Sequence, residues 1–257
     1  MPANKNPIYA AIDTVDLAQA ARVIQRIAAG PVPAVGGIKL GLEFFLAHGA
    51  PGVRYAFPEP VRMTGVGFFL DLKLHDIPNT VAGGIRAVAS LEPTYITIHA
   101  GGGAAMLKAA VDEAALQAAK LGVRRPKLLG VTVLTSLDDA DLKATGVNET
   151  AADQAKRLAL LAREGGLDGV ICSPQEIATL RAACGPDFLL VTPGIRPSGS
   201  AVGDQKRVMT PRDAMRAGAT ALVVGRPITE AADPRAAALA IAHEADLGDK
   251  IRIQVGA

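Results

Sequence analysis

Short apolar runs alternate with amphipathic stretches along most of the chain. The apolar runs predict strands, and the helical spacing of the apolar residues between them predicts helices, several of which are rich in alanine. The predicted strands cover 8–13, 35–42, 65–73, 95–100, 127–136, 169–173, 188–197 with its exit loop, and 221–228. The predicted helices include 17–29, 81–90, the stretch that ends near residue 121, a polar stretch within 138–150, 151–165 and 174–183. This alternation predicts an α/β protein with a parallel sheet.

The number of strand–helix units indicates how the sheet closes. Eight such units in a chain of 257 residues fit a single-domain (β/α)8 TIM barrel that spans residues 1–257. The active site of such a barrel lies at the carboxyl ends of its strands. Polar residues at the ends of the predicted strands are therefore candidate site residues.

The third predicted strand is unusual because charges interrupt its apolar pattern. Asp71 and Lys73 point to the same face of a regular strand, and Asp76 falls just before Pro78, which suits the first turn of a helix. A structural ion pair and a helix-capping Asp76 are the simpler interpretations of each charge taken alone. Burying charges without good partners costs several kcal/mol each, so three of them together favour a catalytic strand end.

Other predicted strands also end in polar side chains. Asp13 follows the first strand, and Lys39 interrupts the second, although a lone lysine could reach solvent from the edge of a core. Thr135 and Ser136 end the fifth strand, where hydroxyls often satisfy only local backbone groups. For His99, at the end of the fourth strand, a hydrogen-bonded structural role is the favoured interpretation.

The last two predicted strands point to a phosphate site. Barrels of this kind often bind phosphate with the loops after strands seven and eight. A single arginine there could be an ordinary surface charge, but the two loops together hold several residues suited to an anion. These residues are Gly194, Arg196, Gln205, Gly225 and Arg226.

Composition narrows the partners and the compartment. A formal charge of +2, an aromatic content of 4% and the absence of Trp do not favour nucleic-acid binding. No apolar run has the length of a membrane span, and the polar N-terminus does not resemble a signal peptide. Cys172 and Cys184 lack a CxxC spacing and fit buried thiols of a reducing compartment. We therefore expect a cytoplasmic protein that binds neither nucleic acid nor membrane.

One stretch resembles a known family. Residues 71–80, with the sequence DLKLHDIPNT, are similar to the signature of the orotidine 5'-phosphate decarboxylase family. The segments 192–196, 204–207 and 225–228 are similar to the phosphate-gripping segments of that family. The resemblance implies decarboxylation of orotidine 5'-phosphate (OMP) to UMP and carbon dioxide, without a cofactor or metal. It also implies that Lys73 protonates C6 of the pyrimidine, within a charge network that includes Asp71, Asp76 and Lys39.

The resemblance also implies the roles of the binding residues. Asp13 and Lys39 would contact the ribose, and Thr135 and Ser136 would face the pyrimidine. Asp76 and Thr80 would enter the site from a neighbouring subunit, which implies a homodimer. The substrate-binding residues implied overall are Asp13, Lys39, Asp71, Thr80, Thr135, Ser136, Pro193, Arg196, Gln205, Gly225 and Arg226.

Two other functions are compatible with parts of the pattern. A hexulose-phosphate synthase or ketogulonate-phosphate decarboxylase shares the Asp-x-Lys-x-x-Asp spacing but uses magnesium and an enediolate. The segments 77–80 and 134–136 favour the pyrimidine nucleotide instead. A non-catalytic barrel that binds a phosphorylated metabolite is the other alternative, and the full set of network charges disfavours it.

Overall fold

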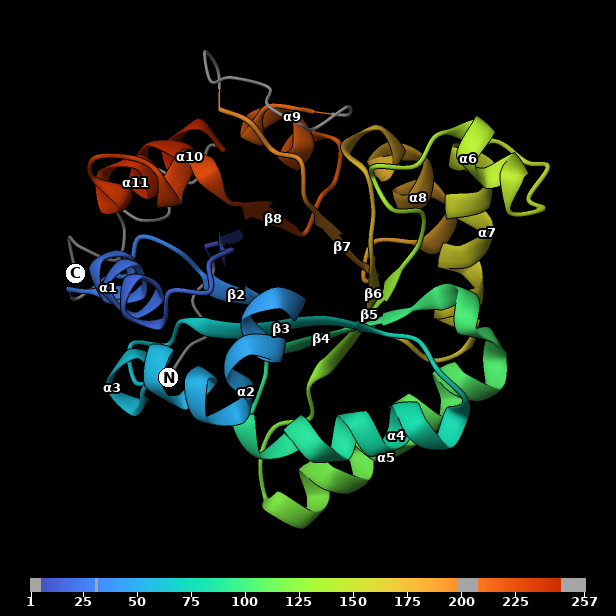
Figure 1. Ribbon diagram of the computed structural model, residues 1–257. Helices are drawn as coiled ribbons and strands as arrows, with labels where there is room; N and C mark the ends of the chain where they lie inside the picture. The colour runs from blue at the N-terminus through green and yellow to red at the C-terminus, as the bar shows by residue number, and fades with distance from the viewer. Residues whose placement is uncertain (1–5, 31, 198–207, 246–257) are drawn as a thin grey trace.

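The eight strands form one closed parallel barrel (Figure 1). The structure is a computed structural model and describes residues 6–30, 32–197 and 208–245. Each strand pairs with the next along the chain, and β1 closes the ring on β8, with Ile8 opposite Leu222. The predicted (β/α)8 fold is confirmed. The strands are β1 (Ile8–Ile12), β2 (Gly37–Gly41), β3 (Gly67–Leu74), β4 (Tyr95–His99), β5 (Lys127–Val131), β6 (Gly169–Ile171), β7 (Leu189–Thr192) and β8 (Ala221–Val224).

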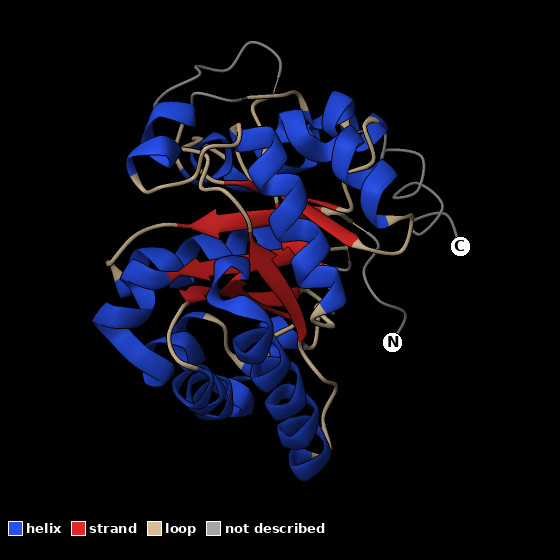
Figure 2. Ribbon diagram, turned by 90° about the vertical axis from the view of Figure 1, so that its right-hand side faces the viewer, coloured by secondary structure: helices blue, strands red, loops and turns tan. Residues whose placement is uncertain are grey.

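Helices enclose the barrel on the outside (Figure 2). Those in the first half of the chain are α1 (Leu17–Ala28), α2 (Leu42–Ala56), α3 (Glu59–Arg62), α4 (Pro78–Val88) and α5 (Gly103–Leu121). The second half adds α6 (Asp139–Ala144), α7 (Ala151–Glu164), α8 (Ile177–Cys184), α9 (Pro211–Arg216), α10 (Arg226–Thr229) and α11 (Pro234–Glu244). Short 3-10 turns occur at Ala89–Leu91, Ala100–Gly102 and Pro174–Glu176.

Two layers of apolar side chains stabilise this arrangement. The larger one lies between strands and helices, where α1 buries Ala20, Ile24 and Ile27 on one face. The smaller one fills the barrel interior and includes Tyr9, whose ring meets that of Phe69 edge-on at 6.0 Å. This interior plug supports the polar residues at the carboxyl ends of the strands.

Several strands end earlier than the sequence pattern predicts. The fifth was predicted over 127–136 but ends at Val131, and a turn follows in which the Leu137 N–H donates to the Leu134 carbonyl. The eighth was predicted over 221–228 but ends at Val224, because Arg226 already begins α10. The residues at these ends therefore lie on loops and turns beyond the strands.

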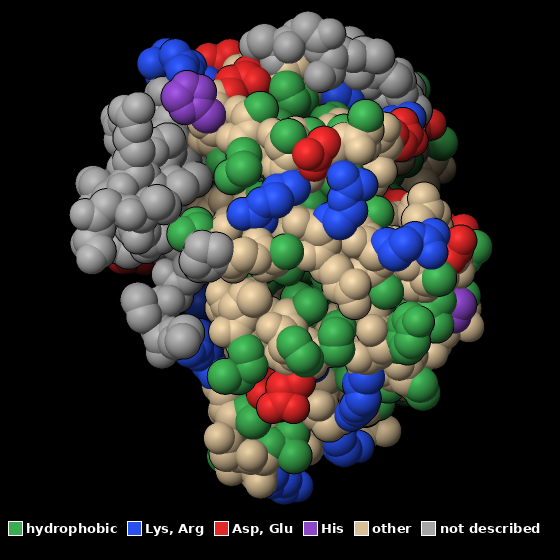
Figure 3. Space-filling view, turned by 90° about the vertical axis from the view of Figure 1, so that its left-hand side faces the viewer, with side chains coloured by type: hydrophobic (Ala, Val, Ile, Leu, Met, Phe, Trp, Pro, Cys, Tyr) green, Lys and Arg blue, Asp and Glu red, His purple; other side chains and the backbone are tan. Residues whose placement is uncertain are grey.

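The outer surface mixes polar and apolar side chains. On the face that carries α1 and α3, acidic and basic side chains lie scattered among apolar and neutral ones (Figure 3). Among the helices of the described ranges, none combines the length and the apolar character needed to cross a bilayer.

Candidate functional site

Four charged side chains from the first three strands meet at the barrel mouth. The Lys39 Nζ atom, on β2, lies 3.1 Å from Asp13 Oδ1 and 3.5 Å from Asp71 Oδ2. The Lys73 Nζ atom donates to Asp71 Oδ2 at 2.8 Å. Lys39 and Asp71 are each only 8% exposed. Of the predicted charge network, the structure brings Lys39, Asp71 and Lys73 together with Asp13, whereas Asp76, also within the described ranges, forms no ion pair with them.

Mutual attraction keeps the buried part of this network ionised. Burial alone would lower the pKa of Lys39, but the carboxylates of Asp71 and Asp13 outweigh it and hold that pKa above its ordinary value. Burial alone would raise the pKa of Asp71, but Lys39 and Lys73 reverse the effect and lower it. The site therefore presents fixed, paired charges at neutral pH.

Thr97 is part of this network, and the sequence analysis did not identify it. Its hydroxyl accepts from the Lys73 backbone N–H at 2.9 Å and donates to Asp71 Oδ1 at 2.8 Å. The available signal was its position on β4, two residues before His99 and on the same face of the strand. The pairing of β3 with β4 that brings it to Asp71 depends on a bulge that alternation does not predict.

That bulge also changes the backbone of Lys73. Leu70 pairs with Ile96 and Leu74 pairs with Ile98, so β3 has more residues than β4 between these paired positions. Lys73 adopts a φ of 50° there, in the left-handed region that costs a non-glycine residue roughly 1–2 kcal/mol. The regular strand predicted through Lys73 was therefore wrong in its local geometry, although Asp71 and Lys73 still approach one another.

A cavity of about 440 Å³ opens above the network. Asp13, Lys39, Asp71 and Lys73 line one side, and residues from the loops after β5, β7 and β8 line the other. The predicted residues brought together around it are Asp13, Lys39, Asp71, Lys73, Thr135, Pro193, Gly194, Arg196, Gly225 and Arg226. Residues far apart in the sequence thus form one site.

Two arginines give the far side of the cavity its positive charge. Partial burial, and then the charge of Arg226, lower the pKa of Arg196. Gly194, with a φ of 77°, turns the chain just before Arg196. Two guanidinium groups that line the same side of one cavity favour a bound anion there. Gln205, predicted for the same purpose, lies outside the described residues.

Three other predicted residues lie away from the described lining of the cavity. Ser136 is exposed in the turn after β5, and Asp76 and Thr80 are exposed around the start of α4. Asp76 Oδ1 accepts from the Ile77 N–H at 2.6 Å. Ile77 is the N-cap residue of α4, and no side-chain hydrogen bond caps that end of the helix. Ile77 itself is 66% exposed. A single chain therefore does not place these three residues in the described lining of the cavity.

His99 packs against His75 beside the network. The two rings are stacked with their centroids 5.1 Å apart and an interplanar angle of 26°. Burial, followed by the charges of His75 and Lys73, lowers the pKa of His99, while Asp71 acts in the opposite direction. His99 is therefore a neutral ring that joins the ends of β3 and β4.

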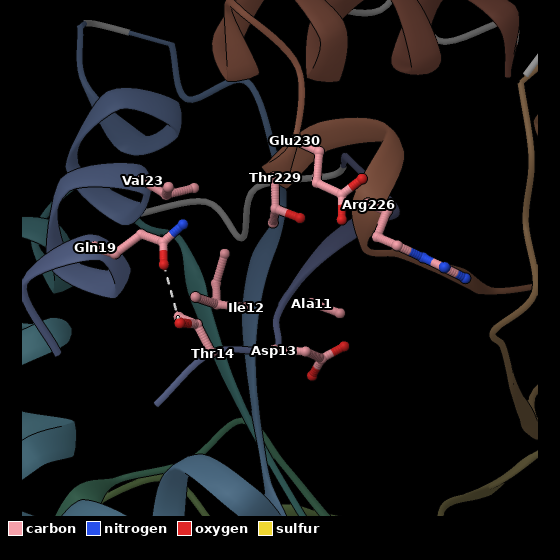
Figure 4. Close-up of a pocket in the computed structure, with 9 residues that line it drawn as sticks. All are labelled: Ala11, Ile12, Asp13, Thr14, Gln19, Val23, Arg226, Thr229 and Glu230. Carbon is pink, nitrogen blue, oxygen red and sulfur yellow. Dashed lines mark hydrogen bonds between the residues drawn. The ribbon is translucent and has the colours of Figure 1, made fainter. Parts of the chain in front are cut away.

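A smaller side pocket adjoins the main cavity (Figure 4). Asp13, Arg226 and Glu230 line both spaces, and the side pocket has a volume of about 160 Å³. Gln19 reaches into it from α1, where its Oε1 accepts from the Thr14 hydroxyl at 3.0 Å. Glu230 brings a carboxylate close to the arginine side of the site.

The acidic residues and histidines do not gather around a single point. Over 6–30, 32–197 and 208–245, no group of three or more His, Cys, Asp or Glu side chains is arranged to hold a metal ion. The positive charges in the described lining of the cavity belong to lysine and arginine side chains.

A closed (β/α)8 barrel with an ionised lysine–aspartate network facing two arginines defines a barrel enzyme with a site for an anionic substrate. A sequence model described as "Orotidine 5'-phosphate decarboxylase / HUMPS family" matches residues 6–241. The chain belongs to this family.

Individual relatives are similar to this chain over nearly its whole length. A protein of Paramagnetospirillum magneticum named orotidine 5'-phosphate decarboxylase is 52% identical over 243 residues, which cover 95% of this chain and 99% of the relative. One of the same name from Moorella thermoacetica is 50% identical and covers 95% of this chain and 93% of its own length. The crystal structure of orotidine 5'-phosphate decarboxylase from Lactobacillus acidophilus has a TM-score of 0.79 and 40% identity, covering 94% of this chain and 99% of that one.

Proposed function

We propose that this protein is a carboxy-lyase that converts OMP to UMP and carbon dioxide, the last step of de novo pyrimidine nucleotide synthesis. The observation that carries the proposal is the placement of the Lys73 ammonium on one side of a cavity and of Arg196 and Arg226 on the other. The names of the relatives, about half identical over nearly the whole chain, support the same reaction.

The substrate extends across the cavity between these two groups. Its phosphate lies against Arg196 and Arg226, with Gly225 beside it and with Gln205, outside the described residues, as a further ligand. Asp13 and Lys39 meet the ribose, and Thr135 lies on the side of the base. Pro193 belongs to the loop after β7 that holds the phosphate. This orientation directs C6 of the pyrimidine toward Lys73.

Lys73 acts on the carbon that loses the carboxylate. The bond from C6 to the carboxylate breaks, its electron pair remains on C6, and carbon dioxide leaves. The fixed ammonium of Lys73 stabilises this developing charge and donates a proton to C6, which forms UMP and leaves a neutral amine. That amine regains a proton from solvent before the next turnover. The reaction needs no cofactor or metal.

Asp71 and Lys39 prepare Lys73 for this step. The Asp71 carboxylate holds the Lys73 ammonium at 2.8 Å, and Lys39 offsets the negative charge of Asp71 and Asp13. A charge arrangement fixed before the substrate binds needs little reorganisation as the carbanion forms. Asp71 therefore orients the Lys73 ammonium and also balances its charge.

The complete site is shared between two subunits of a homodimer. Asp76 and Thr80 are exposed beside the exposed Ile77, so a second copy that covers this edge would bury an apolar side chain and receive both polar ones. The family resemblance of residues 71–80 assigns these two residues to the neighbouring site. Asp76 would complete the charge network around the partner's proton donor.

The protein works in the cytoplasm as a single catalytic domain over 1–257. Both cysteines are free and buried, and burial raises the pKa of Cys172 to about 12. Such thiols are unreactive and suit a reducing compartment.

The direct test follows the loss of OMP absorbance with purified protein, with and without EDTA. We expect equal rates in both arms and UMP as the product. A protein that does not consume OMP would contradict the proposal. Loss of activity in EDTA, restored by magnesium, would instead indicate the metal-dependent chemistry of a sugar-phosphate barrel.

A further inference from the structure

The hydroxyl of Thr97 joins the two residues on which the proposed chemistry depends. It accepts from the backbone N–H of Lys73 at 2.9 Å and donates its proton to Asp71 Oδ1 at 2.8 Å. Thr97 is 0% exposed and is not among the described residues that line the cavity. It can therefore act on the reaction only through its neighbours.

The first contact holds an irregular backbone. The pairing of β3 with β4 is shifted between Leu70 and Leu74, and Lys73 within that shift has a φ of 50°. A bulge removes regular ladder hydrogen bonds at the point where it occurs. Here the side chain of Thr97 supplies an acceptor for the Lys73 N–H, so the left-handed turn is held by β4.

The second contact orients a carboxylate. Because Asp71 Oδ1 is bound by Thr97, the other oxygen, Oδ2, faces the Lys73 ammonium at 2.8 Å and the Lys39 ammonium at 3.5 Å. A carboxylate without this bond could turn about its terminal torsion, which has a broad energy profile. Thr97 thus holds both the backbone of Lys73 and the carboxylate of Asp71.

We propose that Thr97 is a positioning residue for this reaction, whose hydroxyl locks the bulged end of β3 so that the Lys73 ammonium stays on the Asp71 carboxylate, directed at the reacting carbon. This inference rests on the function proposed above. It assigns no contact with the substrate to Thr97.

Four variants separate positioning from simple structural support. Thr97→Val keeps the shape of the side chain and removes the hydroxyl, whereas Thr97→Ser keeps the hydroxyl. The matched control is Thr94→Val, because the Thr94 hydroxyl accepts from the Phe68 N–H at 3.1 Å, between the same two strands but at their amino ends. Thr97→Ala provides a second variant without the hydroxyl if the valine variant does not fold.

The measurements are kcat and KM for OMP, the Kd for UMP, and the temperature of unfolding. We expect Thr97→Val to lower kcat by about ten- to a hundredfold, since small misplacements of reacting groups have effects of this order. The Kd for UMP should change by less than about threefold, because the phosphate and ribose contacts remain. Thr97→Ser should regain most of the activity, and Thr94→Val should keep the kcat of the natural protein even if it unfolds at a lower temperature.

Three results would overturn the inference. They are a near-normal kcat in Thr97→Val and Thr97→Ala, an equal loss of activity in Thr97→Ser, and a similar fall in kcat in Thr94→Val. All three presuppose that the natural protein consumes OMP. An inactive natural protein would instead refute the proposed function, so the two failures are distinguishable.

Discussion

The Lys73 ammonium lies 2.8 Å from the Asp71 carboxylate, on the same strand and separated from it by Leu72 alone. The two side chains differ in access, because that of Asp71 is 11% exposed while that of Lys73 is 34% exposed. The acid is thus held inside the barrel mouth and the amine faces the cavity. Because Asp71 also pairs with Lys39, it keeps a cationic partner when Lys73 is removed.

Lys73→Ala should abolish turnover of OMP and leave the binding of UMP largely intact. In the proposed mechanism the variant loses the proton donor, whereas the arginines and the ribose contacts proposed to hold the product remain. OMP absorbance over long incubations and calorimetric titration with UMP measure the two effects. Lys108→Ala, which removes a lysine paired with Asp112 on the outer surface, is the charge-matched control. Near-normal turnover in Lys73→Ala would reject the assigned role.

Two inactive variants should restore activity when they are mixed. In a homodimer that shares Asp76, a subunit with Lys73→Ala supplies its intact Asp76 to a partner that carries Asp76→Ala and an intact Lys73. Random exchange of equal amounts gives half mixed dimers with one complete site each, so about a quarter of the sites should recover. The rate of OMP loss after unfolding and refolding the mixture together measures this recovery. Absence of recovery, despite mixed dimers, would place Asp76 outside the partner's site.

The arginine side of the cavity should respond to charge in both directions. Arg226→Ala should weaken binding of UMP by at least about tenfold, because a hydrogen bond to a charged group contributes roughly 1.5–3 kcal/mol. Glu230→Gln should strengthen it by about two- to fivefold, since Glu230 lines the same cavity and opposes the anion. Titrations with UMP at fixed ionic strength measure both changes.

Uridine, which lacks the phosphate, is the control ligand for these two variants. Its affinity should change little in either of them. Glu59→Gln, on α3, removes the same charge from an exposed position away from the described lining of the cavity and should leave UMP binding unchanged. Equal effects on uridine and UMP would show that the arginine and the glutamate do not act on the phosphate.

His99 should make the fold sensitive to mild acid. Burial and its neighbours His75 and Lys73 hold the pKa of His99 below its ordinary value of 6.5, so the unfolded chain binds a proton more readily than the folded one. Stability from this group is complete above about pH 6.5 and falls as the pH drops from there toward the lowered pKa. The unfolding temperature of His99→Gln should therefore fall less between pH 7 and pH 5 than that of the natural protein. Parallel curves for the two proteins would contradict this assignment.

The sequence predicted the barrel and most of its mouth because both depend on short-range patterns. Apolar runs marked all eight strands, and charges such as Asp13 and Lys39 stood out against them. The bulge at Lys73 and the hydrogen bonds of Thr97 were missed, because they depend on how β3 pairs with a neighbour distant in the sequence. Thr135 reaches the cavity and Ser136 does not, which depends on the turn after β5. Periodicity within one segment carries no information about such contacts.

Because β1 pairs with β8, residues that follow the first and the last strand lie next to each other at the cavity. Asp13 follows the first strand and Arg226 follows the last, yet the two line one space. A nascent chain on the ribosome therefore has no complete binding site until its eighth strand has emerged and docked. A nucleotide bound as proposed would link the first strand to the last, and a translation product that stopped before β8 would lack Arg226.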